Sequence, residues 1–485
     1  MNRLLRRLVA GATLWLPLAL LAAGACRAAE PRVLGPYGPF GVVRAVGDPQ
    51  ARHAAILLSG PGGWDADAGR AASLLAGLDA LVIGVDTPAY LAGAQAEDGC
   101  PNCSYELETL NKAVQKALGR ERLSIPVLVG LGPGAGATLA YVNLVQAPPG
   151  TFRGGVSVDF RPEIALSNPF CMGKGLTWVL RDGQRTIAYD PVRAFPLYWT
   201  VLQAADFAAF PPALAAEYAA GMPATRVQAL PRAAAAPHGR PWPQALRRAF
   251  LDLAAGQGGD PAAASASPAG DLADLPLVEI RAAGPATGAL AVLVSGDGGW
   301  AGLDQDLAAA LAAAGVDVVG LNSLRYFWRR REPDELGRDL ARILDRYARL
   351  WGRDRFLLIG YSLGADAMPF MASRLPARLL GQVRAIALLS PGHATDLEFQ
   401  VADWLADDAA GGLPIRPEVD RLPGDRVLCL YGEEEDDALC PDLTPAEARA
   451  LSLPGSHHFD GDYQGLARAI LQAAGLPAPE GRETP

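Results

Sequence analysis

A serine between two glycines, directly after an apolar run, is the pattern in this sequence with the clearest chemical potential. The stretch LLIGYSLGAD (residues 357–366) contains Gly-x-Ser-x-Gly, with Ser362 at its centre. When such a serine lies on a sharp turn between a strand and a helix, its hydroxyl is exposed as a nucleophile. The same pattern arises by chance in glycine-rich chains, where the serine only fills a turn. Ser362 is therefore a candidate nucleophile that needs partners elsewhere in the chain.

Acidic residues follow a later apolar run. The stretch RVLCLYG is followed directly by five consecutive acids, residues 433–437. An acid after a late strand can orient a catalytic histidine, although a run of this kind is usually a solvated surface. Asp437, nearest to Cys440, is slightly preferred as the acid, and Glu435 and Asp436 are the alternates.

Two adjacent histidines follow the next apolar run, in LSLPGSHHF. The order serine, acid, histidine is that of the α/β-hydrolase triad, with the histidine after the last strand. His457, which follows Pro-Gly-Ser, is preferred as the general base, and His458 is the alternate.

Donors for an oxyanion are expected from two backbone segments. The N–H of Leu363, directly after the serine, is one, and the N–H of Asp297 in SGDGGW is the other. Trp300, Tyr361 and Arg331 are candidates for contact with the substrate. An ester could be cleaved by these groups alone, so no cofactor and no metal site are expected.

The chain contains an internal control for this chemistry, because its two halves repeat each other in outline. Gly132 in VGLGPGAG takes the place of Ser362, and alanine takes the place of His457 in TRVQALPRAAA. Asp206 is a candidate remnant of the acid. The first half is therefore predicted to be a non-catalytic copy. The matched segments are 54–67 with 290–303, 80–91 with 316–327, and 126–136 with 356–366.

The elements that must position these residues are short continuous apolar runs alternating with helical patterns. Continuous runs indicate strands buried on both faces, so the fold class is α/β, with two hydrolase-like lobes of mainly parallel sheet and flanking helices. Pro333, early acids and late arginines indicate a helix in EPDELGRDLARILDRYARLW. The predicted divisions are a signal peptide (1–29), a degenerate lobe (30–254), a flexible linker (255–275) and a catalytic lobe (276–480).

Composition and the N-terminus indicate the compartment. The net charge of −9 gives no electrostatic footprint for nucleic acid. The N-terminus has arginines, then an apolar run and then small residues, which is typical of a secretory signal peptide. Lipid attachment at Cys26 is an alternative that is not favoured. A periplasmic location is therefore expected, where disulfides form. The expected pairs are Cys429–Cys440 and Cys100–Cys103, with Cys171 left over.

The second half resembles the VirJ family of periplasmic α/β hydrolases, and the two-lobed layout resembles its longer, AcvB-type members. The resemblance is carried by SGDGGW, by YFW followed by Arg331, by GYSLGAD with PF, and by LYGEEEDDALCPDL. Glu332 stands where threonine is more usual, which affects no proposed catalytic role.

This resemblance implies a serine esterase that hydrolyses aminoacyl-phosphatidylglycerol, lysyl or alanyl, at the membrane surface. The acids at 433–437 could attract the substrate's ammonium groups, and the arginines near Arg331 could meet phosphate or simply be a solvated surface. The alternative is a virulence- or secretion-associated periplasmic accessory protein that acts mainly by binding a protein partner. A general carboxylesterase with another ester is a third hypothesis, because fold and triad do not fix the substrate.

Overall fold

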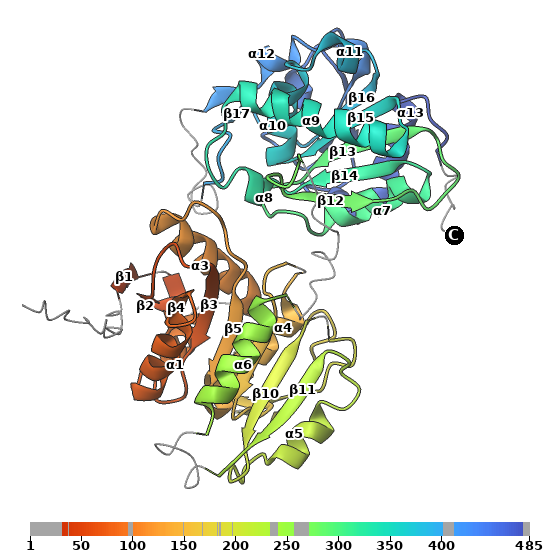
Figure 1. Cartoon of the computed structure of the whole chain (residues 1–485). Helices are drawn as coiled ribbons and strands as arrows, with labels where there is room; N and C mark the ends of the chain where they lie inside the picture. The colour runs from red at the N-terminus through yellow and green to blue at the C-terminus, as the bar shows by residue number, and fades with distance from the viewer. Residues whose placement is uncertain are drawn as a thin grey trace, which may run out of the picture.

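The computed structural model contains two α/β lobes, each built on its own sheet (Figure 1). The predicted signal peptide and residues 257–270 of the predicted linker lie outside the described residues. The structure describes residues 32–36, 38–95, 100–148, 150–166, 168–181, 183, 186–195, 197–232, 241–256, 271–400 and 412–478.

The first lobe has an eight-stranded sheet in the order β1-β2-β4-β3-β5-β6-β10-β11. Strands β1 and β2 are antiparallel to their neighbours, and the others are parallel. A small antiparallel sheet, β7-β9-β8, lies between β6 and β10 in the sequence. The strands are β1 (Arg32–Pro36), β2 (Val42–Val46), β3 (His53–Leu58), β4 (Ala80–Val85), β5 (Val127–Leu131), β6 (Gly155–Val158), β7 (Glu163–Ala165), β8 (Trp178–Arg181), β9 (Thr186–Tyr189), β10 (Trp199–Ala204) and β11 (Thr225–Leu230). The helices are α1 (Ala66–Ala76), α2 (Thr87–Ala94), α3 (Cys103–Ala117), α4 (Ala137–Gln146), α5 (Pro212–Tyr218) and α6 (Pro243–Ala254).

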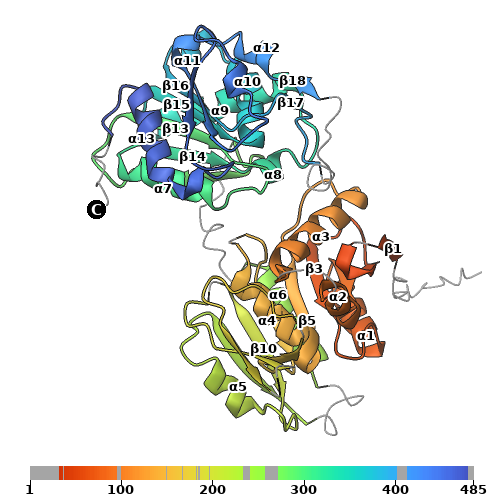
Figure 2. The same cartoon turned by 180° about the vertical axis from the view of Figure 1, so that it is seen from behind.

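The second lobe has a seven-stranded sheet in the order β12-β14-β13-β15-β16-β19-β20, parallel except for β12 (Figure 2). The strands are β12 (Leu277–Ile280), β13 (Ala289–Val294), β14 (Asp317–Leu321), β15 (Arg355–Tyr361), β16 (Val383–Leu389), β17 (Ala394–Thr395), β18 (Leu413–Pro414), β19 (Val427–Gly432) and β20 (Arg449–Leu453). The helices are α7 (Leu303–Ala313), α8 (Ser323–Tyr326), α9 (Pro333–Trp351), α10 (Leu363–Ala372), α11 (Ala377–Leu380), α12 (Arg416–Val419) and α13 (Tyr463–Ala473). The α/β fold class predicted from the sequence is confirmed.

Both faces of the second sheet are buried, which explains its continuous apolar strands. Alternate residues of β13 belong to different clusters, one shared with α9 and α10 and the other with α7 and α13. The helix predicted from the EPDELGRDLARILDRYARLW pattern is α9, which has Pro333 in its first turn and ends at Gly352 in the left-handed conformation. Its buried face consists of Leu336, Leu340, Ile343, Leu344 and Tyr347, among others.

The two lobes share a local packing detail. The Trp300 ring lies so close to β14 that a Cβ atom at Gly320 would be 2.2 Å from it. In the first lobe the Trp64 ring stands in the same relation to Gly84 of β4, again at 2.2 Å. Each lobe thus needs glycine in the strand to seat the tryptophan of its GGW loop.

Some expectations about connections and cysteines need correction. The predicted linker ends earlier than expected, because Leu272 and Leu275 are buried in the core of the second lobe. Cys429 and Cys440 form the predicted disulfide. The expected Cys100–Cys103 pair is wrong: Cys100 bonds to Cys171 instead.

Cys103 is kept apart from its neighbour by secondary structure. It begins α3 on the buried side of the helix, and it is the free cysteine of the described residues. Its thiol lies 3.5 Å from the Gln146 side chain, inside the core. Helix α3 therefore directs Cys103 inward, and Cys100, before the helix, reaches Cys171.

Within the described residues no helix is long and apolar enough to cross a membrane.

Candidate active site

Ser362 lies at the turn between β15 and α10, at the C-terminal edge of the parallel sheet. Its backbone has φ of +51° and ψ of −122°, a strained conformation for a residue with a side chain. The flanking glycines are required by packing: a Cβ at Gly360 would lie 2.2 Å from the Gly364 oxygen, and one at Gly364 would lie 2.2 Å from the Val294 oxygen. This backbone geometry is that of a nucleophile elbow.

Glu435 is the acid that the structure brings to His457. The Glu435 Oε1 atom lies 2.6 Å from His457 Nδ1. Its other oxygen accepts hydrogen bonds from the Ser390 hydroxyl and the Gly432 N–H, both at 2.7 Å. Burial acts to raise the pKa of Glu435, but the bonds from His457, Ser390 and Gly432 outweigh it and lower the pKa. Glu435 is therefore held as a carboxylate beside the imidazole.

This contact fixes the orientation of the histidine. A carboxylate can only accept, so Nδ1 of His457 carries the proton and Nε2 keeps its lone pair, ready to take a proton from a serine. In the described part of the chain no hydrogen bond joins Ser362 to His457, and such contacts commonly tighten only when substrate binds. The histidine lies next to the elbow through Tyr361, whose ring centroid is 5.3 Å from that of His457.

The slightly preferred acid, Asp437, lies elsewhere. Its side chain is 99% exposed and points to His393, with 3.6 Å between Asp437 Oδ1 and His393 Nε2. Asp436 is exposed as well. Of the three candidate acids, Glu435 is the one that contacts His457, and its other oxygen accepts from the Gly432 N–H.

Tyr361 positions the histidine pair and does not line the pocket. Its hydroxyl lies 3.3 Å from the His457 carbonyl oxygen and 3.1 Å from His458 Nδ1. Burial raises the pKa of Tyr361 further above its usual value, so the hydroxyl stays protonated. His458 is occupied by this contact, and burial lowers its pKa. His457 remains the histidine that reaches the acid.

The other two candidates for substrate contact also have structural partners. Trp300 is buried against Gly320. Arg331 donates from Nε to the Tyr326 carbonyl at 2.9 Å, pairs with Glu335, and covers the Tyr326 ring. Neither side chain lines the pocket beside Ser362.

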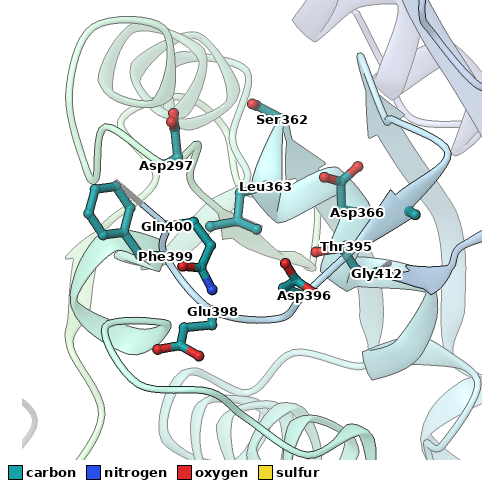
Figure 3. A pocket seen from close by; sticks show the side chains of 11 residues that line it. Asp297, Ser362, Leu363, Asp366, Thr395, Asp396, Glu398, Phe399, Gln400 and Gly412 are labelled. Atoms are coloured by element: carbon teal, nitrogen blue, oxygen red, sulfur yellow. The ribbon is translucent and has the colours of Figure 1, made fainter. Parts of the chain in front are cut away.

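A pocket of about 180 Å³ opens beside Ser362 (Figure 3). Both predicted oxyanion residues, Leu363 and Asp297, line it together with the serine. One wall comes from segment 394–400, which follows β16 and contributes most of the remaining lining. The complete lining consists of Asp297, Ser362, Leu363, Asp366, Ala394, Thr395, Asp396, Glu398, Phe399, Gln400 and Gly412.

The pocket is strongly acidic, which the sequence did not predict. Four carboxyl groups line it, those of Asp297, Asp366, Asp396 and Glu398. Burial raises the pKa of Asp366 to about 7, and its Oδ1 accepts a hydrogen bond from the Gly392 N–H at 2.8 Å. Asp366 lies four residues after Ser362, so the sequence could have suggested it as a pocket residue. No pattern in the sequence indicated that segment 394–400 would line the same pocket.

The first lobe repeats the framework with glycine at the position of the elbow serine. Gly132 follows β5 where Ser362 follows β15, and its φ of +72° repeats the elbow. Asp206 is an exposed residue just after β10, the strand that corresponds to β19. The predicted alanine counterpart of His457 lies outside the described residues.

Fold and site together define a serine hydrolase of the α/β-hydrolase type in the second lobe, with a serine elbow and an acid–histidine pair at one sheet edge. Residues 288–476 match the family model described as bacterial virulence protein (VirJ). The match lies within the second lobe and agrees with the resemblance that its motifs indicated.

Solved structures that resemble part of the chain include esterases and hydrolases. Est1E from Butyrivibrio proteoclasticus is 15% identical, with 40% of this chain and 91% of that chain covered and a TM-score of 0.31. A serine hydrolase homologue from Coxiella burnetii is 18% identical, with coverages of 40% and 89% and a TM-score of 0.27. An esterase domain from Rhodothermus marinus is 17% identical, with coverages of 41% and 91% and a TM-score of 0.30. A search of curated proteins returned no match.

Proposed function

We propose that this protein is a periplasmic serine esterase that cleaves the aminoacyl ester of aminoacyl-phosphatidylglycerol, releasing the amino acid and phosphatidylglycerol. The observation that carries the proposal is the acidic pocket beside Ser362. An aminoacyl ester carries an ammonium group close to its carbonyl carbon. Carboxylates around the nucleophile attract that charge, and they disfavour ordinary anionic or neutral esters.

The reaction needs only groups of this chain. Ser362 Oγ attacks the ester carbonyl carbon while its proton passes to His457 Nε2, and the N–H groups of Leu363 and Asp297 receive the oxyanion. The C–O bond to the glycerol oxygen breaks, and His457 returns the proton to that oxygen, so phosphatidylglycerol leaves. Water, activated by His457, then hydrolyses the acyl-enzyme and frees the amino acid.

The number of carboxylates favours a dicationic aminoacyl group. Alanine brings one ammonium charge, whereas lysine brings a second one at the end of a long side chain. Four acidic side chains line the pocket and Lys116 compensates only Glu398, so acidic groups remain for a second ammonium group. Lysyl-phosphatidylglycerol is therefore proposed as the better substrate and alanyl-phosphatidylglycerol as the poorer one.

The test is to incubate the purified protein with vesicles that contain lysyl- or alanyl-phosphatidylglycerol and to quantify the released amino acid. We expect release by the wild type, faster with the lysyl lipid, and a loss of about 1,000-fold or more in Ser362→Ala. Circular dichroism of the variant is the control for folding.

Labelling by a fluorophosphonate probe separates the alternatives. Labelling that depends on Ser362, without release from either lipid, would mean a hydrolase of another ester and would reject the proposed substrate. Neither labelling nor release would favour the accessory protein that acts by binding a partner.

A further inference from the structure

We infer that the first lobe, which has Gly132 in place of the elbow serine, positions the wall of the active-site pocket in the second lobe through Lys116. Lys116 lies near the C-terminal end of α3, and its partners belong to the second lobe. This inference rests on the proposed function for its kinetic consequences, but not for its structural ones.

The wall in question is segment 394–400, which contributes six residues to the pocket lining. The second lobe holds it through one strand pairing, two backbone hydrogen bonds and Leu397, which is buried in the core of that lobe. Strand β17 pairs with β18, the Phe399 N–H donates to the Phe327 carbonyl at 2.7 Å, and the Arg331 N–H donates to the Leu397 carbonyl at 3.0 Å. At its end, the Glu398 side chain is held by Lys116 of the other lobe, and Phe399 packs with Trp328 of its own lobe and Leu123 of the other. The six lining residues are Ala394, Thr395, Asp396, Glu398, Phe399 and Gln400.

Lys116 makes three contacts across the junction. Its Nζ lies 2.8 Å from Glu398 Oε1 and donates to the Trp328 carbonyl at 2.6 Å. It also lies 5.2 Å from the centre of the Trp328 ring. The Lys116 and Glu398 side chains are only 23% and 26% exposed, so this ion pair is screened less than a pair on the open surface.

An aromatic pair extends the junction to Phe399. The Trp328 and Phe399 rings are stacked, with centroids 5.7 Å apart, and Leu123 of the first lobe packs against them. Trp328 Nε1 donates to the Arg120 carbonyl at 2.9 Å, which anchors this pair to the end of α3. Lys112, one turn before Lys116, lies 5.8 Å from the Phe399 ring centre.

The consequence is that α3 fixes the place of two pocket residues that the catalytic lobe holds only in part. Glu398 belongs to the acidic wall, and Lys116 compensates its charge and ties it down. Without Lys116, Glu398 loses its cationic partner in the wall of an acidic pocket, and segment 394–400 loosens. The elbow and the Glu435–His457 pair, which Lys116 does not touch, keep their geometry.

The experiment compares full-length wild type with Lys116→Met, which removes the charge and retains much of the alkyl packing. The structural readout is hydrogen–deuterium exchange of peptides covering residues 394–400, expected to be about tenfold faster in the variant. The kinetic readout is lysyl-phosphatidylglycerol hydrolysis, expected to show KM raised about fivefold and kcat within twofold. Fluorophosphonate labelling of Ser362 is expected to stay within twofold of wild type, because the small probe needs only the elbow.

Matched variants complete the design. Lys116→Arg is expected to retain protection, and Glu398→Gln to lose it as Lys116→Met does. Lys116→Glu and Glu398→Lys are each expected to remove the protection of residues 394–400 from exchange. The double variant, which restores an ion pair with the charges exchanged, is expected to regain that protection. Arg70→Met is the control, because Arg70 pairs with Asp67 of its own helix, α1.

Unchanged exchange at residues 394–400 in Lys116→Met would overturn the inference, whatever the activity. A lower KM in that variant would also overturn it, because it would mean that Lys116 only offsets charge in the pocket. If wild type releases no amino acid from the lipid, the proposed function fails, while the exchange experiment still decides whether Lys116 holds the segment.

Discussion

Glu435 and Asp437 are two residues apart in the same acidic run, but they have different environments. Glu435 is half-buried and accepts from His457, Ser390 and Gly432. Asp437 is 99% exposed beside His393. Sequence could supply the run and the two histidines, but not the side chain that points inward, because five consecutive acids share almost the same local pattern.

Replacing Glu435 by Gln tests this assignment. Glutamine keeps the shape but not the charge, so His457 loses both its fixed tautomer and the stabilisation of its protonated form. We expect kcat to fall about 100-fold or more in Glu435→Gln and to change less than threefold in Asp437→Asn. Equal losses in the two variants, measured as lysine release from lysyl-phosphatidylglycerol, would contradict the assignment.

Asp366 predicts a pH dependence of substrate binding. Its pKa is raised to about 7 by burial, and the neighbouring charged groups are Asp297, which raises it, and His457, which lowers it. Below this pKa the side chain is neutral, and above it the carboxylate attracts the ammonium group. We expect KM for the lysyl lipid to fall severalfold between about pH 6 and pH 8 in wild type. In Asp366→Asn this fall should be absent, and a profile identical to wild type would argue against the role.

At the scale of elements, the candidate catalytic groups, and Ser390 that bonds to Glu435, occupy loops after strands of one parallel sheet. Ser362 follows β15, Ser390 follows β16, Glu435 follows β19 and His457 follows β20. The carboxyl ends of parallel strands meet at one edge, so residues far apart in sequence converge there. This part was predictable, because strand order and continuous apolar runs are local patterns.

The Cys429–Cys440 disulfide closes the acidic loop that holds Glu435. Its cysteines are 11 residues apart and both buried, so the bond restricts the loop on either side of Glu435. Changing both to alanine is expected to lower the free energy of unfolding of the second lobe by about 2–4 kcal/mol and to reduce kcat. The matched control is Cys100→Ala with Cys171→Ala, which removes the first-lobe disulfide and should leave kcat nearly unchanged. Urea denaturation and amino-acid release provide the two measurements.

At the scale of the whole molecule, the chain contains two copies of one fold, which differ in having Gly132 or Ser362 at the elbow. The seven strands β2-β4-β3-β5-β6-β10-β11 repeat the order of the second sheet. Ser59 Oγ accepts from the Thr87 N–H at 2.9 Å, and Ser295 Oγ accepts from the Ser323 N–H at 2.9 Å. The first copy has Gly132 at its elbow and supplies α3 to the junction with the second.

The sequence by itself determined the fold class and the elbow turn around Ser362, because strands and the elbow depend on neighbours within one strand–turn–helix unit. Gly360 and Gly364, for example, are required by contacts that any such elbow makes. Only the tertiary structure decided which acid meets His457, which cysteine Cys100 joins, and that Lys116 reaches Glu398. Lys116 and Glu398 are 282 residues apart, and no periodicity or spacing records such a contact. Side-chain direction and long-range packing arise only when the two lobes are folded and joined.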